Sequence, residues 1–109
     1  MDCVEIDSKD ASRVKGDVYW SYKGIAVLPE SIGDLTVDGT LWLSNNKLAT
    51  LPASFGSLTV GGVLNLNYNN LATLPASFGD LKVGGRVYLS DNPVAASGPR
   101  FDGLDVYYG

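Results

Sequence analysis

The chain repeats itself every 23 residues, and this constrains its fold more than any other feature. The Leu-Pro pairs that begin at Leu28, Leu51 and Leu74 are each 23 positions apart. The segments 51–73 and 74–96 are nearly identical in sequence. A period of this length is typical of a solenoid, in which each unit is too small to bury its own apolar side chains and must stack on its neighbours. The sequence therefore predicts a stacked repeat fold, with surface binding as its default function.

A second pattern lies between the Leu-Pro pairs. The segments 41–48 (LWLSNNKL), 64–71 (LNLNYNNL) and 87–94 (VYLSDNPV) carry aliphatic residues and an asparagine at the same spacing. A degenerate copy, 18–25, lies 23 residues before the first of them. Several copies in phase are much more specific than a single motif match.

These segments have the LxLxxNxL pattern, and from about Val14 to Val106 the chain resembles the leucine-rich repeat family. The LPxSxGxL segments resemble the 23-residue intracellular type found in Ras-group and bacterial leucine-rich repeats. The resemblance implies an α/β-type leucine-rich-repeat solenoid of about four repeats. It implies short parallel strands on the concave face and irregular or short 3-10 turns on the convex face. We expect an N-terminal capping segment at 1–13, repeats at 14–96, and a degenerate repeat or C-terminal cap at 97–109.

The physical chemistry of the repeat agrees with this interpretation. Alternating leucines predict a short strand with one buried face. The asparagine after each strand can satisfy backbone groups of the bend, which predicts an inward ladder of Asn46, Asn69 and Asn92. Phe55 and Phe78, with Ile32 in the earlier copy, should fill the core from the convex side. We expect Gly33, Gly56 and Gly79 to permit a turn beside them.

One departure from the family pattern precedes each strand. The first leucine of the usual motif is replaced by Asp38, Gly61 and Gly84, and we expect the preceding Val37, Val60 and Val83 to make the core contact instead. The Val-Gly-Gly sequence predicts a glycine kink or bulge where the chain enters the strand.

The two ends differ from the repeats. Cys3–Asp7 is out of phase, and its alternation suggests a capping strand. Phe101, Leu104 and Val106 still occupy repeat positions, but Ser97 and Gly98 replace the Leu-Pro pair. The segment 105–109 reads as an edge strand, which can pair with another chain. Three alternatives stay open: a decayed repeat that acts as a cap, self-association through this edge, and a module cut from a longer array.

Composition excludes some classes of function and location. The net charge is −4 with no basic cluster, which argues against nucleic acid as a partner. No stretch is long enough to span a membrane, and we expect no membrane partner. The sequence has one cysteine, no Asn-x-Ser/Thr site and no apolar leader at its N-terminus. We therefore expect a cytoplasmic or otherwise intracellular protein.

No arrangement of residues indicates catalysis. The sequence contains no histidine, and its lone cysteine has no activating partner. The Gly-Gly pairs recur with the period, so we assign them to the backbone and not to phosphate binding. The aspartates are scattered along the repeats and read as solvated turn residues. We expect no enzyme activity, no metal site and no cofactor.

The candidate binding face consists of the strand residues that alternate with the buried leucines. The middle position of each strand carries Tyr19, Trp42, Asn65 and Tyr88, and position 86, just before the last strand's core residue, carries Arg86. Beyond the strands come Tyr22, Asn45 and Tyr68. Exposed aromatics supply contact area with few torsions to freeze, which favours binding. They are also good strand formers that stabilise one another across a ladder. Trp20 replaces a core leucine and should be buried.

The sequence thus predicts a non-catalytic protein-protein interaction module that binds an unknown partner through its aromatic concave face. Two alternatives remain. The aromatics could stack on sugar rings, with Asn45, Asn65 and Asn67 bonding to hydroxyl groups. The chain could also be a structural fragment of a longer repeat array.

Overall fold

The computed structural model describes residues 13–101 and 103–108 of the 109-residue chain. It consists of short strands and 3-10 helices that recur in the same order in successive repeats. The strands are β1 Arg13–Val14, β2 Val18–Tyr19, β3 Thr36–Val37, β4 Leu41–Trp42, β5 Thr59–Val60, β6 Leu64–Asn65, β7 Lys82–Val83, β8 Arg86–Tyr88 and β9 Asp105–Tyr107. The 3-10 helices are η1 Glu30–Asp34, η2 Ala53–Ser57, η3 Ala76–Asp80 and η4 Pro93–Ala96.

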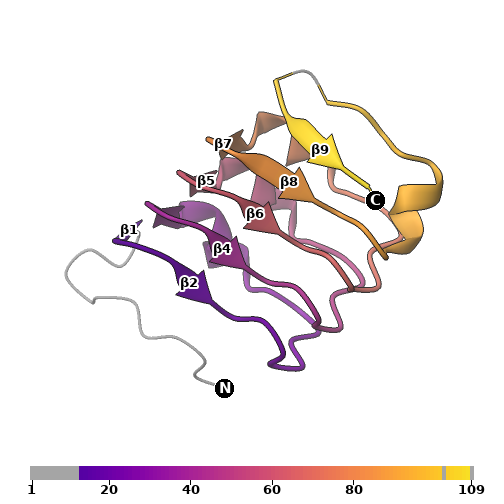
Figure 1. Cartoon of the computed structure of the whole chain (residues 1–109), viewed down its shortest axis with the longest axis horizontal. Coiled ribbons are helices and arrows are strands. Elements are labelled where there is room, and N and C mark those ends of the chain that lie inside the picture. The colour runs from indigo at the N-terminus through magenta and orange to yellow at the C-terminus, as the bar shows by residue number, and fades with distance from the viewer. Residues whose placement is uncertain (1–12, 102, 109) are drawn as a thin grey trace.

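The strands form two parallel sheets, one with the order β1-β3-β5-β7 and one with the order β2-β4-β6-β8-β9. We call the first the four-stranded sheet and the second the five-stranded sheet. In Figure 1 the strands of the five-stranded sheet lie side by side along the length of the molecule, from β2 to β9. The 3-10 helices η1, η2 and η3 stack on one another in the same direction. The solenoid of short parallel strands and 3-10 turns is therefore confirmed.

The chain bends at the residues where a kink was expected, 38–39, 61–62 and 84–85, but the strands before these bends form a sheet that the sequence did not predict. Val37, Val60 and Val83 each end one of these strands, and β3 pairs in register with β5, which pairs with β7. Gly-Gly, or Asp-Gly in the earlier repeat, then turns the chain into the five-stranded sheet. Val37 and Val60 are 0% and 1% exposed, so they make the expected core contact, while Val83 is partly buried.

The core is a set of stacked rows. Leu41, Leu64 and Val87 are aligned by the register of the five-stranded sheet, and all are 0% exposed. Phe55 and Phe78 stack with ring centroids 6.0 Å apart and an interplanar angle of 4°. Each side chain packs on its equivalent in the next repeat, so a repeat buries its apolar groups only when stacked.

The asparagine ladder is confirmed. The Asn69 Oδ1 accepts a hydrogen bond from the Leu48 backbone N–H at 3.1 Å, and its Nδ2 donates to the Leu43 and Leu66 carbonyls at 3.0 Å. Asn46 and Asn92 make the equivalent contacts one repeat earlier and one repeat later. Each asparagine therefore joins two repeats and satisfies backbone groups that would otherwise be buried without partners.

The glycines of the 3-10 helices are constrained by contact and not by turn geometry, which corrects our expectation. A Cβ atom on Gly56 would lie 1.9 Å from the Ser77 carbonyl oxygen, and one on Gly33 would lie 2.3 Å from that of Ser54. Neither glycine has a positive φ. A side chain here would separate two repeats whose backbones touch.

The last turn of the chain is shorter than the others. Phe101 packs on Phe78 with centroids 5.1 Å apart, as its repeat position predicts. Val106, however, pairs with Val87 in the five-stranded sheet and not with Val83 in the four-stranded sheet, so its predicted position is wrong. The residues that pair here are 19 positions apart and not 23. Among the described residues, the last turn therefore contributes no strand to the four-stranded sheet.

Pro93 ends the asparagine ladder. In earlier repeats the Lys47 and Asn70 backbone N–H groups donate to the Ile25 and Leu48 carbonyls at 2.8 Å. Pro93 stands at the equivalent position and has no N–H, so Val94 donates to the Leu71 carbonyl instead, also at 2.8 Å. The Val94 N–H then needs no asparagine from a following repeat.

The predicted capping strand at Cys3–Asp7 lies outside the described residues. No helix in the described part of the chain is both long and apolar enough to cross a membrane.

Candidate functional site

The outer face of the five-stranded sheet carries two aromatic groups with a polar strip between them. Strand alternation puts Tyr19, Trp42, Asn65, Tyr88 and Tyr107 in one row, because the register aligns them across β2, β4, β6, β8 and β9. Tyr19 is 66% exposed and Tyr107 is 46% exposed, while the other three are partly buried. We call this row the aromatic row.

Tyr19 and Trp42 form the first aromatic group. Their rings are nearly parallel, at 7°, with centroids 6.3 Å apart. The Tyr19 hydroxyl donates to Asp17 Oδ2 at 2.9 Å, and the Thr40 backbone N–H donates to Asp17 Oδ1 at 2.7 Å. These two hydrogen bonds, that of Thr40 first, lower the pKa of Asp17, and the hydrogen bond to Asp17 raises the pKa of Tyr19. The carboxylate thus fixes the tyrosine ring over the start of β4.

The second aromatic group joins β8 to β9. Tyr88 and Tyr107 meet edge to face, with centroids 5.7 Å apart at 79°. The Arg86 guanidinium lies 6.0 Å from the Tyr88 ring centre and 5.4 Å from that of Tyr107, and its Nε is 3.2 Å from Asp105 Oδ2. The hydrogen bond and the charge of Asp105 raise the pKa of Arg86. Arg86 is therefore already engaged by an acid and two rings.

The polar strip between these groups consists of Asn65 and Asn67, whose side-chain oxygens accept hydrogen bonds from the chain's own backbone. The Asn65 Oδ1 accepts from the Asn67 backbone N–H at 3.0 Å, and the Asn67 Oδ1 accepts from the Ser90 backbone N–H at 2.7 Å. Ser21 and Ser44 are joined through their hydroxyls at 2.8 Å. These side chains therefore also brace the ends of the strands.

A second row follows the strands at the point where the chain leaves the sheet. Tyr22, Asn45, Tyr68 and Asp91 all have left-handed backbone conformations, with φ between 57° and 59°. Tyr22 is 78% exposed and Tyr68 is 55% exposed. We call this row the corner row. Its conformation suits asparagine and aspartate, but it is unusual for tyrosine.

The eight predicted site residues thus do not form one cluster, because seven belong to the aromatic row or the corner row and Arg86 lies beside the aromatic row at the start of β8. Five of them, Tyr19, Trp42, Asn65, Arg86 and Tyr88, lie on the strands or beside them, and three, Tyr22, Asn45 and Tyr68, lie in the corner row. Sequence reasoning missed Tyr107 as a member of the aromatic row. The repeated Val-Tyr of Val87-Tyr88 and Val106-Tyr107 is the signal that could have found it.

Two tryptophan N–H groups lie inside without partners. Trp20 is 8% exposed, so its predicted burial is confirmed. Within the part of the chain that the structure describes, the Nε1–H groups of Trp20 and Trp42 are buried and donate to no oxygen. The Trp42 N–H is therefore covered by other atoms, and only part of the Trp42 side chain is exposed to solvent.

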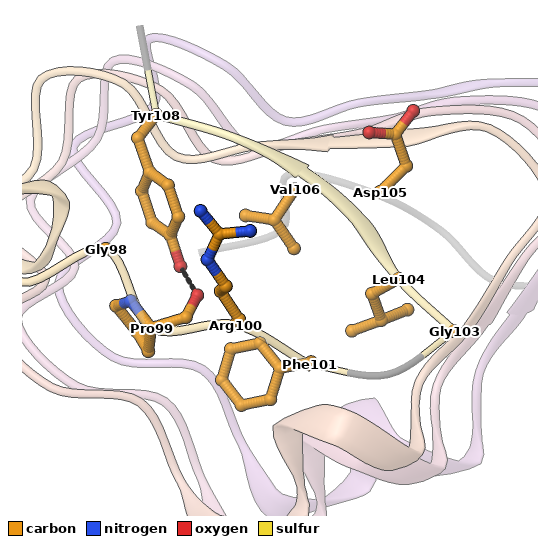
Figure 2. A pocket seen from close by; sticks show the side chains of 9 residues that line it. All are labelled: Gly98, Pro99, Arg100, Phe101, Gly103, Leu104, Asp105, Val106 and Tyr108. Carbon is orange, nitrogen blue, oxygen red and sulfur yellow. Dashed lines mark hydrogen bonds between the residues drawn. The ribbon is translucent and has the colours of Figure 1, made fainter.

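A pocket of about 490 Å³ lies at the C-terminal end of the stack. Figure 2 shows Phe101, Leu104 and Val106 around it, with the Arg100 side chain between Tyr108 and Val106 and with the Tyr108 hydroxyl donating to the Pro99 carbonyl. The described residues of the last turn add no strand to the four-stranded sheet, so β7 is left at its edge on this side. The pocket thus follows from the shortened turn, and it contains none of the eight predicted site residues.

No arrangement of acidic or thiol groups resembles a metal site in the described ranges, 13–101 and 103–108, where no three His, Cys, Asp or Glu side chains come together. The arrangement of the aromatic and corner rows offers contact area and hydrogen-bonding groups.

Comparison with known proteins agrees with the geometry. A sequence model described as Leucine Rich Repeat matches residues 40–58 and 63–81. These two ranges each run through one strand of the five-stranded sheet and the 3-10 helix that follows it. A search of curated proteins gives no significant match. The two adjacent matches, the stacked parallel strands and the asparagine ladder identify residues 40–58 and 63–81 as leucine-rich repeats.

Proposed function

We propose that this chain is a protein-interaction module that binds its partner through the aromatic row of the five-stranded sheet. Leucine-rich repeat domains generally act as protein-interaction modules and are typically not enzymes. The single observation that carries the proposal is the parallel pair of Tyr19 and Trp42, in which a ring that is 66% exposed covers a second ring on a surface open to solvent.

Aromatic side chains are suited to anchoring a partner. They provide a large contact area at a low cost in side-chain entropy, and they are enriched among the residues that dominate binding energy. Asp17 holds Tyr19 in place through a hydrogen bond of 2.9 Å, so little further ordering is needed on binding. The Arg86, Tyr88 and Tyr107 group supplies a second anchor at the other end of the row.

A carbohydrate ligand is less well supported. A sugar surface needs free amide oxygens and N–H groups beside the rings to bond to hydroxyl groups. The amide oxygens of Asn65 and Asn67 already accept backbone hydrogen bonds at 3.0 and 2.7 Å. The Trp42 N–H is also covered by other atoms, so a ligand cannot reach it. We therefore favour a protein partner. A location inside the cell belongs to the same proposal, because the one cysteine of the sequence leaves no disulfide within the chain.

The test is a quantitative capture experiment with the intact chain and two variants, Trp42→Ala and Tyr88→Ala. Proteins from the source cells are captured on each immobilised form and quantified by mass spectrometry. We expect at least one protein that the wild type captures to be lost from both variants. Asp80→Ala, on the exposed end of η3, is the matched control and should retain it.

Stability must be measured in parallel, because the rings also support one another across the ladder. Thermal unfolding of each variant shows whether binding is lost because the contact surface has changed or because the protein has unfolded. If both variants unfold earlier but capture the same proteins as the wild type, the aromatics serve the sheet and the proposal is wrong. If a tryptophan fluorescence titration with an oligosaccharide saturates while no protein depends on Trp42, the ligand is a glycan.

A further inference from the structure

The corner row contains two tyrosines at positions where the backbone disfavours them. Tyr22 and Tyr68 have φ values of 59°, in the left-handed region. A bulky residue in this region is an outlier, because its Cβ crowds the following carbonyl group. Such residues persist where the surrounding structure fixes the backbone, and they concentrate at functional positions.

The fold fixes this backbone whatever residue occupies it. The backbone N–H groups of the corner row are hydrogen-bonded to the next repeat. The Tyr22 N–H donates to the Ser44 carbonyl at 3.3 Å, the Asn45 N–H to the Asn67 carbonyl at 2.9 Å, and the Tyr68 N–H to the Ser90 carbonyl at 3.0 Å. Asn45 and Asp91 adopt the same φ within 2°. These two residue types are the ones that the conformation favours. The repeat therefore needs a left-handed residue here, and it does not need a tyrosine.

Burial does not account for the tyrosines either. Tyr22 is 78% exposed and Tyr68 is 55% exposed, so neither ring fills the core. A side chain that strains its backbone and remains in solvent contributes little to folding. Contact with another molecule is the remaining physical reason for its presence.

Charge indicates what kind of molecule this is. Lys23 follows Tyr22 directly and Lys47 comes two residues after Asn45, and both are exposed. The ion pairs of the described residues, Arg13–Asp38 and Arg86–Asp105, do not include them. A local pair of lysines on a chain of net charge −4 attracts acidic groups to this corner and not to the rest of the surface. Asp91 limits the basic region at the far end of the row.

Spacing indicates the conformation of the ligand. Neighbouring strands of a sheet lie about 4.8 Å apart, so Tyr22 and Tyr68, two repeats apart, are separated by roughly 10 Å along the stack. A polyproline II helix advances about 9.3 Å in three residues and returns the same face after each such turn. Aromatic side chains commonly line the surfaces that bind this conformation.

We propose that Tyr22, Lys23, Asn45, Lys47 and Tyr68 form a second binding surface that accepts an acidic segment of a partner protein in the polyproline II conformation. The two tyrosines contact the same face of the segment at every third residue, and the two lysines pair with its carboxylates. This proposal rests on the proposed function in one respect only, because the segment belongs to a protein partner. It uses none of the residues of the aromatic row.

The experiment measures binding of a fluorescently labelled peptide, (Glu-Pro-Pro)4, to the intact chain by anisotropy at low salt. The control peptides are (Lys-Pro-Pro)4, which reverses the charge, and (Glu-Gly-Ser)4, which keeps the charge but is flexible. We expect (Glu-Pro-Pro)4 to bind at least tenfold more tightly than either. The double variant Tyr22→Asn/Tyr68→Asn uses a residue that the row already contains, so it preserves the fold and should weaken binding at least tenfold.

Two further variants separate the contribution of the lysine charges from any contribution of the aromatic row. Lys23→Gln/Lys47→Gln should weaken binding and flatten its salt dependence, because screening acts on the charged contacts. Trp42→Ala should leave peptide binding unchanged. If peptide binding requires Trp42, the surface belongs to the aromatic row and this proposal is wrong. If Trp42→Ala retains both the peptide and the captured proteins, the proposed function fails while this proposal stands.

Three results overturn the proposal. The first is the absence of any binding to (Glu-Pro-Pro)4. The second is binding that survives the double tyrosine variant. The third is equal binding of (Glu-Pro-Pro)4, (Glu-Gly-Ser)4 and a sulfated oligosaccharide, which would make the corner a general anion site.

Discussion

The rows of side chains inside the solenoid keep either apolar residues or asparagine from repeat to repeat, whereas the rows outside it change between aromatic and polar residues. Inside, Leu43, Leu66 and Leu89 are all 0% exposed, and Asn46, Asn69 and Asn92 repeat the same hydrogen bonds. Outside, the aromatic row runs through tyrosine, tryptophan, asparagine and tyrosine, and the corner row alternates tyrosine with asparagine or aspartate.

The difference separates two demands on the sequence. An inner residue must match its equivalents above and below, because each contacts both neighbours and a mismatch leaves a void or an unpaired polar group. An outer residue has solvent on one side and can change without disturbing the stack. Differences among the outer residues can therefore give each repeat its own binding properties, while the similar inner residues stabilise the fold.

The largest effect should come from the inner aromatic stack. Phe55→Ala removes a side chain that is 0% exposed and that stacks on Phe78. The expected loss is about 3–5 kcal/mol of unfolding free energy, because the cavity lies between two repeats and cannot collapse. Chemical denaturation with circular dichroism measures it. Tyr19→Ala, an outer aromatic, is the control and should cost much less.

The next comparison is between Asn69, in the buried asparagine ladder, and Asn65, in the aromatic row. Asn69→Ala leaves the buried Leu48 N–H without its side-chain partner, whereas the Leu43 and Leu66 carbonyls keep their hydrogen bonds from Asn46 and Asn92. One buried unpaired group costs about 1–3 kcal/mol. Asn65→Ala removes only a hydrogen bond to the Asn67 N–H on the partly exposed face. Denaturation of both variants should therefore rank Asn69 well above Asn65, and equal losses would contradict the division into inner and outer rows.

A glycine variant tests whether the distance between neighbouring repeats is as tightly constrained as the inner side chains are. Gly61→Ala puts a Cβ 2.3 Å from the Asp38 carbonyl oxygen, a backbone atom that can move only with its repeat. We expect a loss of about 1–3 kcal/mol from overpacking. Ser57→Ala, at an exposed position on η2, is the control and should change the stability little. An unchanged midpoint for Gly61→Ala would mean that the repeats can separate at this point.

Much of the inner structure was predictable from the sequence, because it depends on residues that repeat in register. The asparagine ladder, the Phe55 and Phe78 stack and the burial of Val37 and Val60 all follow from spacing and polarity. The four-stranded sheet was not predicted, since strands of two residues show no alternation and glycine normally disfavours strands. Only the contact of one Gly-Gly turn with the next explains why glycine is needed there.

The outer surface was predictable as a set of residues but not as an arrangement. The sequence put Tyr22 and Tyr68 beside the strands, but it gave no reason to expect a left-handed backbone under a tyrosine. Asn45 and Asp91 at the same phase were the available signal. Val106 was misplaced because its Asp-Val-Tyr segment resembles both kinds of strand, and only the shortened last turn decides between them.

A reciprocal exchange in the corner row tests the claim that its tyrosines strain the fold. Tyr68→Asn should raise the unfolding free energy by about 1 kcal/mol, and Asn45→Tyr should lower it by a similar amount, because the left-handed conformation favours asparagine. Thermal and chemical denaturation of the two variants measure both signs. If Tyr68→Asn destabilises the chain, the tyrosine packs productively and its presence needs no binding function.

The smallest expected effect concerns the outer carboxylate of Asp17. The hydrogen bonds from the Thr40 N–H and the Tyr19 hydroxyl hold its pKa below the ordinary aspartate value of about 3.9. A carboxyl group whose pKa is lowered by folding stabilises the folded state above its unfolded pKa. This contribution disappears as the pH falls through the folded pKa. Asp17→Asn should therefore unfold slightly earlier than the wild type at pH 7, and the difference should vanish in strong acid.

The same contact has a second, independent readout. Because Asp17 raises the pKa of Tyr19, Asp17→Asn should lower that pKa, and the change is visible in a phenol resonance followed by NMR through alkaline pH. A Tyr19 titration that does not respond to Asp17→Asn would mean that the carboxylate does not hold the ring in solution. The aromatic row would then be ordered by the stacking of Tyr19 on Trp42 alone, and its first anchor would be no better prepared for binding than any exposed tyrosine.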